Sequence, residues 1–119
     1  MLTPTEIAAI AAKALDDKKA KDIKILKTVE HTVLADYFVI CNGTSNSHVK
    51  ALVDEVDKQL SLAGEPPVRR EGMRSDIWVL MDFGSVIVHV FTDEARKFYN
   101  LERLWSDAEE IPLSALLRP

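Results

Sequence analysis

The chain has 119 residues, of which 47% are hydrophobic and 29% are charged, with 19 acidic side chains against 15 basic ones. This length fits one compact domain, and this composition disfavours disorder, collagen-like repeats and residence in a membrane. The net charge of -4 argues against strong direct binding of nucleic acid through many phosphates, and it favours a basic protein surface as the partner.

The chain opens with a complete set of helix-start signals. Thr3 suits the N-cap, Pro4 the first helical position and Glu6 the third, where its carboxylate closes a capping box. Apolar residues then recur every three or four positions from Ile7 onward, and a run of lysines follows. The pattern predicts an amphipathic helix that ends in a solvated basic segment.

Two short strands are predicted next. The segment from Asp22 to Thr28 alternates in polarity, and the segment from Asp36 to Asn42 is rich in aromatic and β-branched residues. The second segment is apolar on both faces, which predicts a central strand covered on each side. Its Cys41 is expected to be a small buried hydrophobe and not a nucleophile, because no sequence feature supplies a base.

A second helix is predicted after the loop Gly43-Thr44-Ser45-Asn46, whose side-chain oxygens suit an N-cap. Apolar residues from Val49 to Leu60 mark one helical face, and Gly64 supplies the stop. The Pro66-Pro67 pair then forces an extended or turning segment. Strand, tight loop, helix and strand in this order indicate a compact α/β or α+β domain.

The segment from Asp76 to Phe91 predicts an antiparallel hairpin whose two faces differ in kind. With an even loop around Gly84, the face from Ile77 to Val90 is wholly aliphatic and belongs in the core under helices. The opposite face carries Trp78, Leu80, Asp82, Ile87, His89 and Phe91. An indole ringed by a few charged groups is typical of a protein interface. The alternative is that Trp78 lies under a terminal helix and His89 is a satisfied sheet residue.

Another helix start is predicted at Thr92-Asp93-Glu94. Phe98, Leu101 and Trp105 fall on one face of this helix, and such a stripe is more often core than a ligand site. Residues 105–119 are expected to be a C-terminal tail whose aliphatic residues pack on the domain or on a neighbouring subunit.

Motifs for cofactors and catalysis are missing from the sequence. The glycines are too far apart for a dinucleotide-binding or P-loop motif, and the histidines show no metal-ligand spacing, so we expect no cofactor and no metal. The loop Gly43-Thr44-Ser45 leaves one alternative, a nucleotide-binding enzyme of the nucleotidyltransferase type. Such enzymes need grouped carboxylates for divalent cations, and no Asp-x-Asp pair lies on a predicted strand. We therefore do not expect an enzyme.

The cysteine count and the amino terminus bear on the compartment. The lone Cys41 cannot form an intramolecular disulfide, and the first residues carry neither a charged leader nor an apolar stretch of signal-peptide length. We therefore expect a cytoplasmic protein.

Six short sequence motifs occur in an order and at a spacing that closely resemble those of one protein family. They are Asp36-Tyr37-Phe38-Val39-Ile40, Gly43-Thr44-Ser45, Glu71-Gly72-Met73-Arg74, Trp78-Val79-Leu80-Met81-Asp82-Phe83-Gly84, Val88-His89-Val90-Phe91 and Arg96-x-Phe98-Tyr99-x-Leu101-Glu102-x-Leu104-Trp105. Together they resemble the Iojap-like family of ribosomal silencing factors, RsfS, from the first helix to Trp105. The sequence departs from the commonest family pattern at Ser47 and Ser85, which weakens any claim about charge pairs at those two positions.

The resemblance implies that residues 1–119 form a single domain, with a mixed central sheet flanked by helices, related to the nucleotidyltransferase fold without catalysis. It implies a factor that binds the universal large-subunit ribosomal protein fourteen and sterically blocks joining of the small subunit, which represses translation when nutrients are scarce. Several members of the family are homodimers, so a homodimer is a possible state of this chain.

The hairpin pattern and the resemblance together suggest the partner-binding residues. Trp78 is expected to be the anchor, and Asp82 is expected to pair with a basic side chain of the partner. His89 and Tyr99 are expected to make polar contacts at the rim, and Leu80 is expected to contribute apolar contact area.

Overall fold

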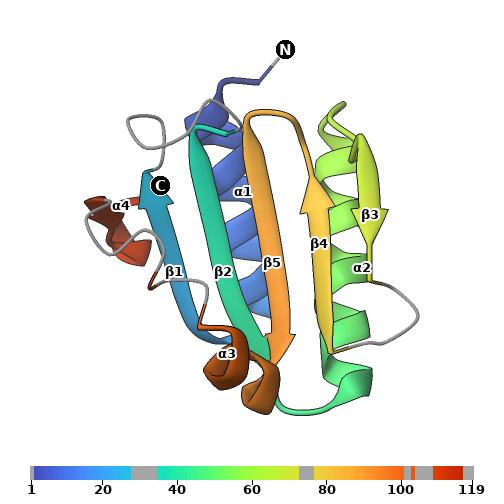
Figure 1. Ribbon diagram of the computed structural model, residues 1–119. Coiled ribbons are helices and arrows are strands. Elements are labelled where there is room, and N and C mark those ends of the chain that lie inside the picture. Colours follow the sequence, from blue (N-terminus) through green and yellow to red (C-terminus); the bar gives the residue numbers. More distant parts are fainter. Residues whose placement is uncertain (1, 28–34, 73–76, 101–102, 104–108, 117–119) are drawn as a thin grey trace.

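The computed structural model of the chain describes residues 2–27, 35–72, 77–100, 103 and 109–116 (Figure 1). Its strands are β1 (Lys21–Lys27), β2 (Tyr37–Gly43), β3 (Arg69–Glu71), β4 (Trp78–Asp82), β5 (Val86–Thr92) and β6 (Glu109–Ile111). Its helices are α1 (Pro4–Asp17), α2 (Asn46–Leu62), α3 (Asp93–Tyr99) and α4 (Leu113–Leu116). The described strands form one six-stranded sheet in the order β3-β4-β5-β2-β1-β6, in which β2 and β5 run parallel. The predicted α/β class with a mixed central sheet is confirmed.

The starts of both long helices are those predicted from their caps. In α1, Thr3 accepts a hydrogen bond from the amide of Glu6 over 3.1 Å, and the Glu6 carboxylate accepts one from the amide of Thr3 over 2.9 Å. Hydrogen bonding of the Glu6 carboxyl to the backbone amide and to the side chain of Thr3 lowers its pKa. In α2, Ser45 is the N-cap, and Gly64 takes the left-handed conformation (φ 89°) after the helix ends. None of the described helices is both long and apolar enough to cross a bilayer.

Both long helices lie on one face of the sheet, behind it in Figure 1. The main core lies between these helices and the sheet, and it includes the aliphatic face of the β4–β5 hairpin. There Val79 lies opposite Val90, and both are fully buried. The predicted assignment of this face is confirmed, except that Ile77 precedes β4 and is exposed.

The strand β2 is central, as predicted, with β1 on one side and β5 on the other. Val39 and Cys41 contribute to the main core, whereas Phe38 and Ile40 belong to a second cluster on the opposite face. Burial raises the pKa of the Cys41 thiol to about 12, so the thiolate that a nucleophile requires is not formed at neutral pH. The interpretation of Cys41 as a small buried hydrophobe is confirmed.

The outermost strands, β3 and β6, were not predicted from the sequence, and neither was the four-residue helix α4. Each of the two strands has three residues and charged side chains, so neither shows the alternation that indicates a strand. Short charged strands of this kind protect the edges of a sheet from further pairing. Beyond β6, Leu113 and Leu116 pack against the chain's own main core, as does Ile111. The described part of the tail, residues 109–116, therefore packs on its own domain.

The expected core stripe of Phe98, Leu101 and Trp105 is wrong for Phe98, which is 82% exposed. The helix α3 ends at Tyr99 because Asn100 adopts a left-handed conformation, with φ 44° and ψ 53°. The helix is therefore too short to carry the predicted stripe. Leu101 and Trp105 lie outside the described residues.

Candidate protein-docking face

The sheet face opposite α1 and α2 carries the second hydrophobic cluster of the chain. Its buried members are Leu26, Ala35, Phe38, Ile40, Ile87, Phe91 and Ala95, with Trp78 and Leu80 partly buried against them. We call the part of this surface formed by Phe38, Trp78, Leu80, His89, Phe91 and Tyr99 the aromatic face. Of the described helices, the seven-residue α3 is the one on this side, and it lies at one end of the sheet (Figure 1).

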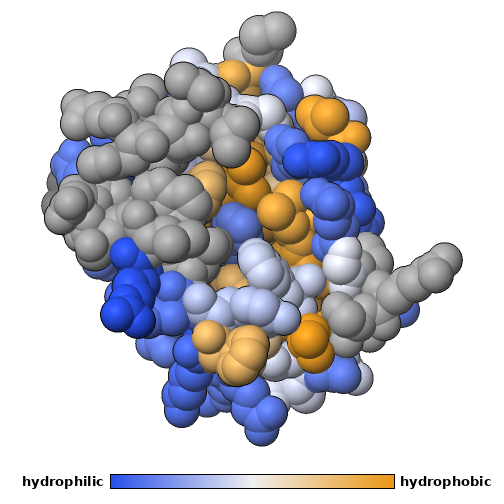
Figure 2. Space-filling view, viewed as in Figure 1, coloured by the Kyte–Doolittle hydropathy of each residue, from blue (hydrophilic) through white to orange (hydrophobic). Residues whose placement is uncertain are grey.

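The aromatic face is partly open. Figure 2 views the molecule from this side and shows hydrophobic surface near the middle of the face, with hydrophilic surface along the edge that holds β3. Trp78, Leu80 and Asp82 are each partly exposed. Trp78 and Asp82 are therefore not fully buried. The alternative, in which Trp78 lies under a terminal helix, is met only in part, because Tyr99 at the end of α3 contacts the indole and leaves it partly exposed.

The indole of Trp78 is held by other aromatic rings of the chain. It stacks on Phe91 with a centroid distance of 5.1 Å and an interplanar angle of 24°, and it meets the ring of Tyr99 at 4.7 Å. Its Nε1–H donates a hydrogen bond to Nδ1 of His89 over 3.1 Å. The hydrogen-bond donor of Trp78 is thus engaged inside the chain, and the orientation of the indole is fixed by contacts from the strand β5 and the helix α3.

His89 corrects one expectation from the sequence. Its side chain is 3% exposed, so it cannot make the polar rim contact expected of it. The ring lies 5.0 Å from the centroid of Phe38, and burial lowers the pKa of His89 to about 4. The imidazole is therefore neutral at physiological pH, and it lies beneath the surface that Trp78 presents.

Asp82 lies at the end of β4, where its two carboxylate oxygens have separate partners. Oδ1 accepts a hydrogen bond from the amide of Gly84 over 2.7 Å, and Oδ2 accepts one from Nε of Arg69 over 3.2 Å. Because Asp82 already pairs with Arg69, a basic side chain of a partner must share or replace this contact. The role of Asp82 in binding stays a prediction.

The aromatic rings continue from the face onto α3. Tyr99 is partly exposed, and Phe98 meets it edge-on at 5.1 Å. Beside them lies an open groove of about 350 Å³, lined by Ile77, Thr92, Glu94, Ala95, Phe98 and Tyr99. Sequence reasoning missed Phe98 as a surface residue. The signal was Asn100, a residue type that often ends a helix in the left-handed conformation.

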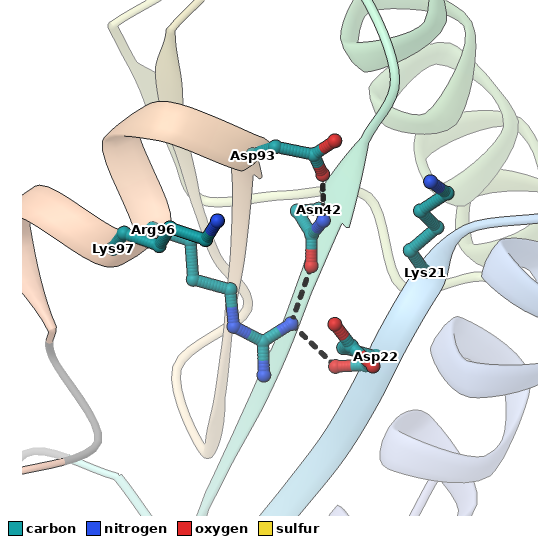
Figure 3. Close-up of a pocket in the computed structure, with 6 residues that line it drawn as sticks. All are labelled: Lys21, Asp22, Asn42, Asp93, Arg96 and Lys97. Carbon is teal, nitrogen blue, oxygen red and sulfur yellow. Dashed lines mark hydrogen bonds between the residues drawn. The ribbon is translucent and has the colours of Figure 1, made fainter.

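A polar pocket of about 370 Å³ lies at the carboxyl ends of the parallel strands, and its lining is Lys21, Asp22, Asn42, Asp93, Arg96 and Lys97 (Figure 3). The side-chain amide of Asn42 donates to the carboxylate of Asp93. Arg96 donates to Oδ1 of Asn42 over 2.7 Å and also to the backbone carbonyl of Asp22. These hydrogen bonds link α3 to β1 and β2. The polar cluster therefore has a structural role, because it holds α3 against the sheet. Sequence reasoning missed this cluster.

The loop Gly43-Thr44-Ser45 does not form an evident phosphate site. Thr44 and Ser45 line a pocket of about 330 Å³ that Asp93 and Glu94 also line, and these carboxylates oppose a phosphate group. Within the described ranges, no three His, Cys, Asp or Glu side chains are grouped to hold a metal ion. The arrangement therefore gives no support to the nucleotidyltransferase alternative.

Comparison with known proteins agrees with this geometry. The chain matches the family model described as "Ribosomal silencing factor during starvation" over residues 2–119. It is 45% identical over 102 residues to the ribosomal silencing factor RsfS of Bacillus subtilis, with 86% of each chain covered. It is 37% identical over 95 residues to the mouse "Mitochondrial assembly of ribosomal large subunit protein 1", with 77% of this chain and 42% of that protein covered. A crystal structure of a Chromobacterium violaceum protein superposes with a TM-score of 0.86 at 41% identity, with 88% of each chain covered.

Proposed function

The chain belongs to the family of ribosomal silencing factors, and from this membership we propose that it represses translation by docking on the large ribosomal subunit. The proposed partner is the universal large-subunit ribosomal protein fourteen, and the bound factor sterically blocks joining of the small subunit. The mouse relative is named for assembly of the large ribosomal subunit, which supports this choice of subunit. Occlusion needs no catalytic group, and a factor of this kind acts on ribosomes in the cytoplasm.

One observation carries the proposal: Trp78 is partly exposed on a sheet face that neither long helix covers. Tryptophan is enriched among the residues that contribute most to binding energy in protein interfaces. Because Phe91 and Tyr99 hold the indole from within the chain, little side-chain entropy is lost when a partner covers it. The preorganised ring is the proposed anchor of the interface.

The residues around Trp78 suggest how the partner is oriented. Leu80 extends the apolar contact area on the same face of β4, and the partly exposed ring of Tyr99 borders it from α3. Asp82 places a carboxylate at the end of the strand, where a basic side chain can approach it. The net charge of -4 favours encounter with a basic ribosomal protein, because complementary charge steers association and fixes register.

Co-sedimentation with separated ribosomal subunits tests this function, followed by a subunit-joining assay. The wild-type chain is expected to pellet with large subunits and to inhibit joining. Trp78→Ala is expected to weaken binding by about thirtyfold, the effect of losing an anchor worth ~2 kcal/mol. The matched control is Leu62→Ala, because Leu62 is 75% exposed on α2 in the layer behind the sheet. Wild-type binding by Trp78→Ala, or no binding by the wild-type chain, contradicts the proposal.

A homodimer of the free factor is a further part of the proposal. The tail supports it less than its composition suggested, because Ile111, Leu113 and Leu116 contact the chain's own core. Light scattering over a range of concentrations measures the oligomeric state. The same measurement on Trp78→Ala tests whether the dimer uses the aromatic face, in which case dimerisation and docking on the ribosome compete.

A further inference from the structure

The hydrogen bond between Trp78 and His89 joins neighbouring strands on the aromatic face. In the β4–β5 register Trp78 lies opposite Phe91 and Leu80 lies opposite His89, so the bonded pair is diagonal. The indole Nε1–H is a donor only. Nδ1 of His89 must therefore be the acceptor, and the neutral ring carries its proton on Nε2.

That tautomer leaves a buried donor that has no partner in the part of the chain that the structure describes. Nε2 of His89 is buried and makes no hydrogen bond to any described residue. An unpaired buried N–H destabilises a fold, and a phenylalanine fills a similar space without that cost. Packing alone therefore does not explain a histidine here. The contact that a histidine makes and a phenylalanine does not is the hydrogen bond that Nδ1 accepts from Nε1–H of Trp78.

We propose that His89 is a positioning residue for docking, which acts by holding the indole of Trp78 in the orientation that the partner meets. This inference rests on the proposed function, because it assumes that Trp78 is the anchor. His89 is too buried to touch the partner directly, so its effect passes through Trp78. Without the bond, the indole loses one of its constraints, and the partner must order it on binding.

Three substitutions of His89 separate positioning from packing. His89→Phe keeps an aromatic ring and removes the acceptor. His89→Asn places an amide oxygen at the position of Nδ1, because Oδ1 of asparagine is equally far along the side chain. His89→Gln places its amide at the position of Nε2 and serves as the control of similar polarity. If positioning is the role of His89, affinity for the large subunit depends on whether the side chain at this position places a hydrogen-bond acceptor where Nδ1 lies.

Two measurements are made on each variant. The first is the NMR resonance of the Trp78 indole N–H and its rate of exchange with water, in a Trp105→Phe background because the chain has two tryptophans. The second is the affinity for large ribosomal subunits. Thermal melting of each variant shows that it is folded. The spectroscopic readout reports the bond directly, whereas a purely structural role of His89 moves only the melting temperature.

His89→Phe is expected to remain folded, to speed exchange of the indole proton and to weaken docking by about three- to tenfold. His89→Asn is expected to retain slow exchange and to dock more tightly than His89→Phe and His89→Gln. Wild-type affinity in His89→Phe, or equal affinity in His89→Asn and His89→Gln, overturns the proposal while leaving the function intact. Failure of the wild-type chain itself to bind large subunits overturns the proposed function, and the positioning role with it.

Discussion

The guanidinium of Arg96 donates a hydrogen bond to Oδ1 of Asn42 over 2.7 Å, although the two residues are 54 positions apart in the chain (Figure 3). Both side chains are buried, Arg96 on α3 and Asn42 near the end of β2. The helix α3 has seven residues, of which Ala95 and Arg96 are buried. The position of α3 on the sheet therefore depends more on polar contacts than on a stripe of apolar side chains. The same contacts set the position of the Tyr99 ring at the end of α3.

Replacing Arg96 by methionine is expected to destabilise the fold by about 2 to 4 kcal/mol, because the buried Oδ1 of Asn42 and the carbonyl of Asp22 lose their donor. Arg96→Lys is not expected to restore stability, since an ammonium group lacks the planar fork of the guanidinium. Urea unfolding measures the free energy of unfolding of both variants. The matched control is Lys97→Met, an exposed neighbour on the same helix, with an expected change within about 0.5 kcal/mol. Equal losses in Arg96→Met and Lys97→Met contradict the structural role.

Gly72 offers a test of how closely the backbone approaches β4. A Cβ atom added at Gly72 would lie 2.1 Å from the carbonyl oxygen of Trp78, and the backbone of Gly72 has a φ of +86°. Gly72→Ala must therefore shift the backbone, with an expected loss of about 2 kcal/mol or more. Gly84→Ala is the control, because Gly84 has φ +84° but no atom within 4 Å of its added Cβ. It is expected to cost about 1 kcal/mol, the strain of the left-handed conformation alone. Equal destabilisation in urea unfolding argues against the close approach.

Phe98 is expected to matter for docking and not for folding. It is 82% exposed, so Phe98→Ser is expected to change the free energy of unfolding by less than about 0.5 kcal/mol. Because Phe98 continues the aromatic face through Tyr99, the same variant is expected to weaken binding to large subunits about fivefold. Leu62→Ser, on the helical layer, is the control for loss of an exposed apolar side chain. Unchanged binding by Phe98→Ser would place Phe98 outside the interface.

Features of the fold that depend on short-range chemistry were predictable from the sequence. The capping box of Thr3 and Glu6 involves residues three apart, and its geometry follows from the residue types. The two faces of the hairpin follow from strict alternation, which places Val79 in the core and Trp78 on the opposite side. The open position of Trp78 was inferred from the mixture of residue types on its face.

Features that depend on distant parts of the chain were not predictable. Arg96 follows the acidic start of a helix, and a basic residue at that place is normally expected to be solvated. Its buried partner Asn42 is brought to it only by the fold. His89 suggests a polar surface group until β2 places Phe38 against it. The burial of a polar side chain depends on what covers it, and a single sequence does not contain that information.

His89 also predicts how stability depends on pH. Its pKa is about 4 in the folded chain against an ordinary value of 6.5, because burial penalises the charged ring. Between these values the unfolded chain binds a proton that the folded chain does not, so stability is full above pH 6.5 and is lost as the pH falls towards 4. The expected contribution of His89 is a loss of about 2 kcal/mol between pH 7 and pH 5.

The contribution of His89 is isolated by comparing the wild-type chain with His89→Asn, which has no titrating group at this position. Urea unfolding at pH 7 and pH 5 gives, for each of the two chains, the change in the free energy of unfolding between these pH values. Carboxylates such as Glu6 contribute equally to both changes. The wild-type chain is expected to lose more stability than His89→Asn over this interval. Equal losses would show that the imidazole binds its proton as readily in the folded chain as in the unfolded one. An imidazole that does so is accessible to water, which contradicts its place beneath Trp78.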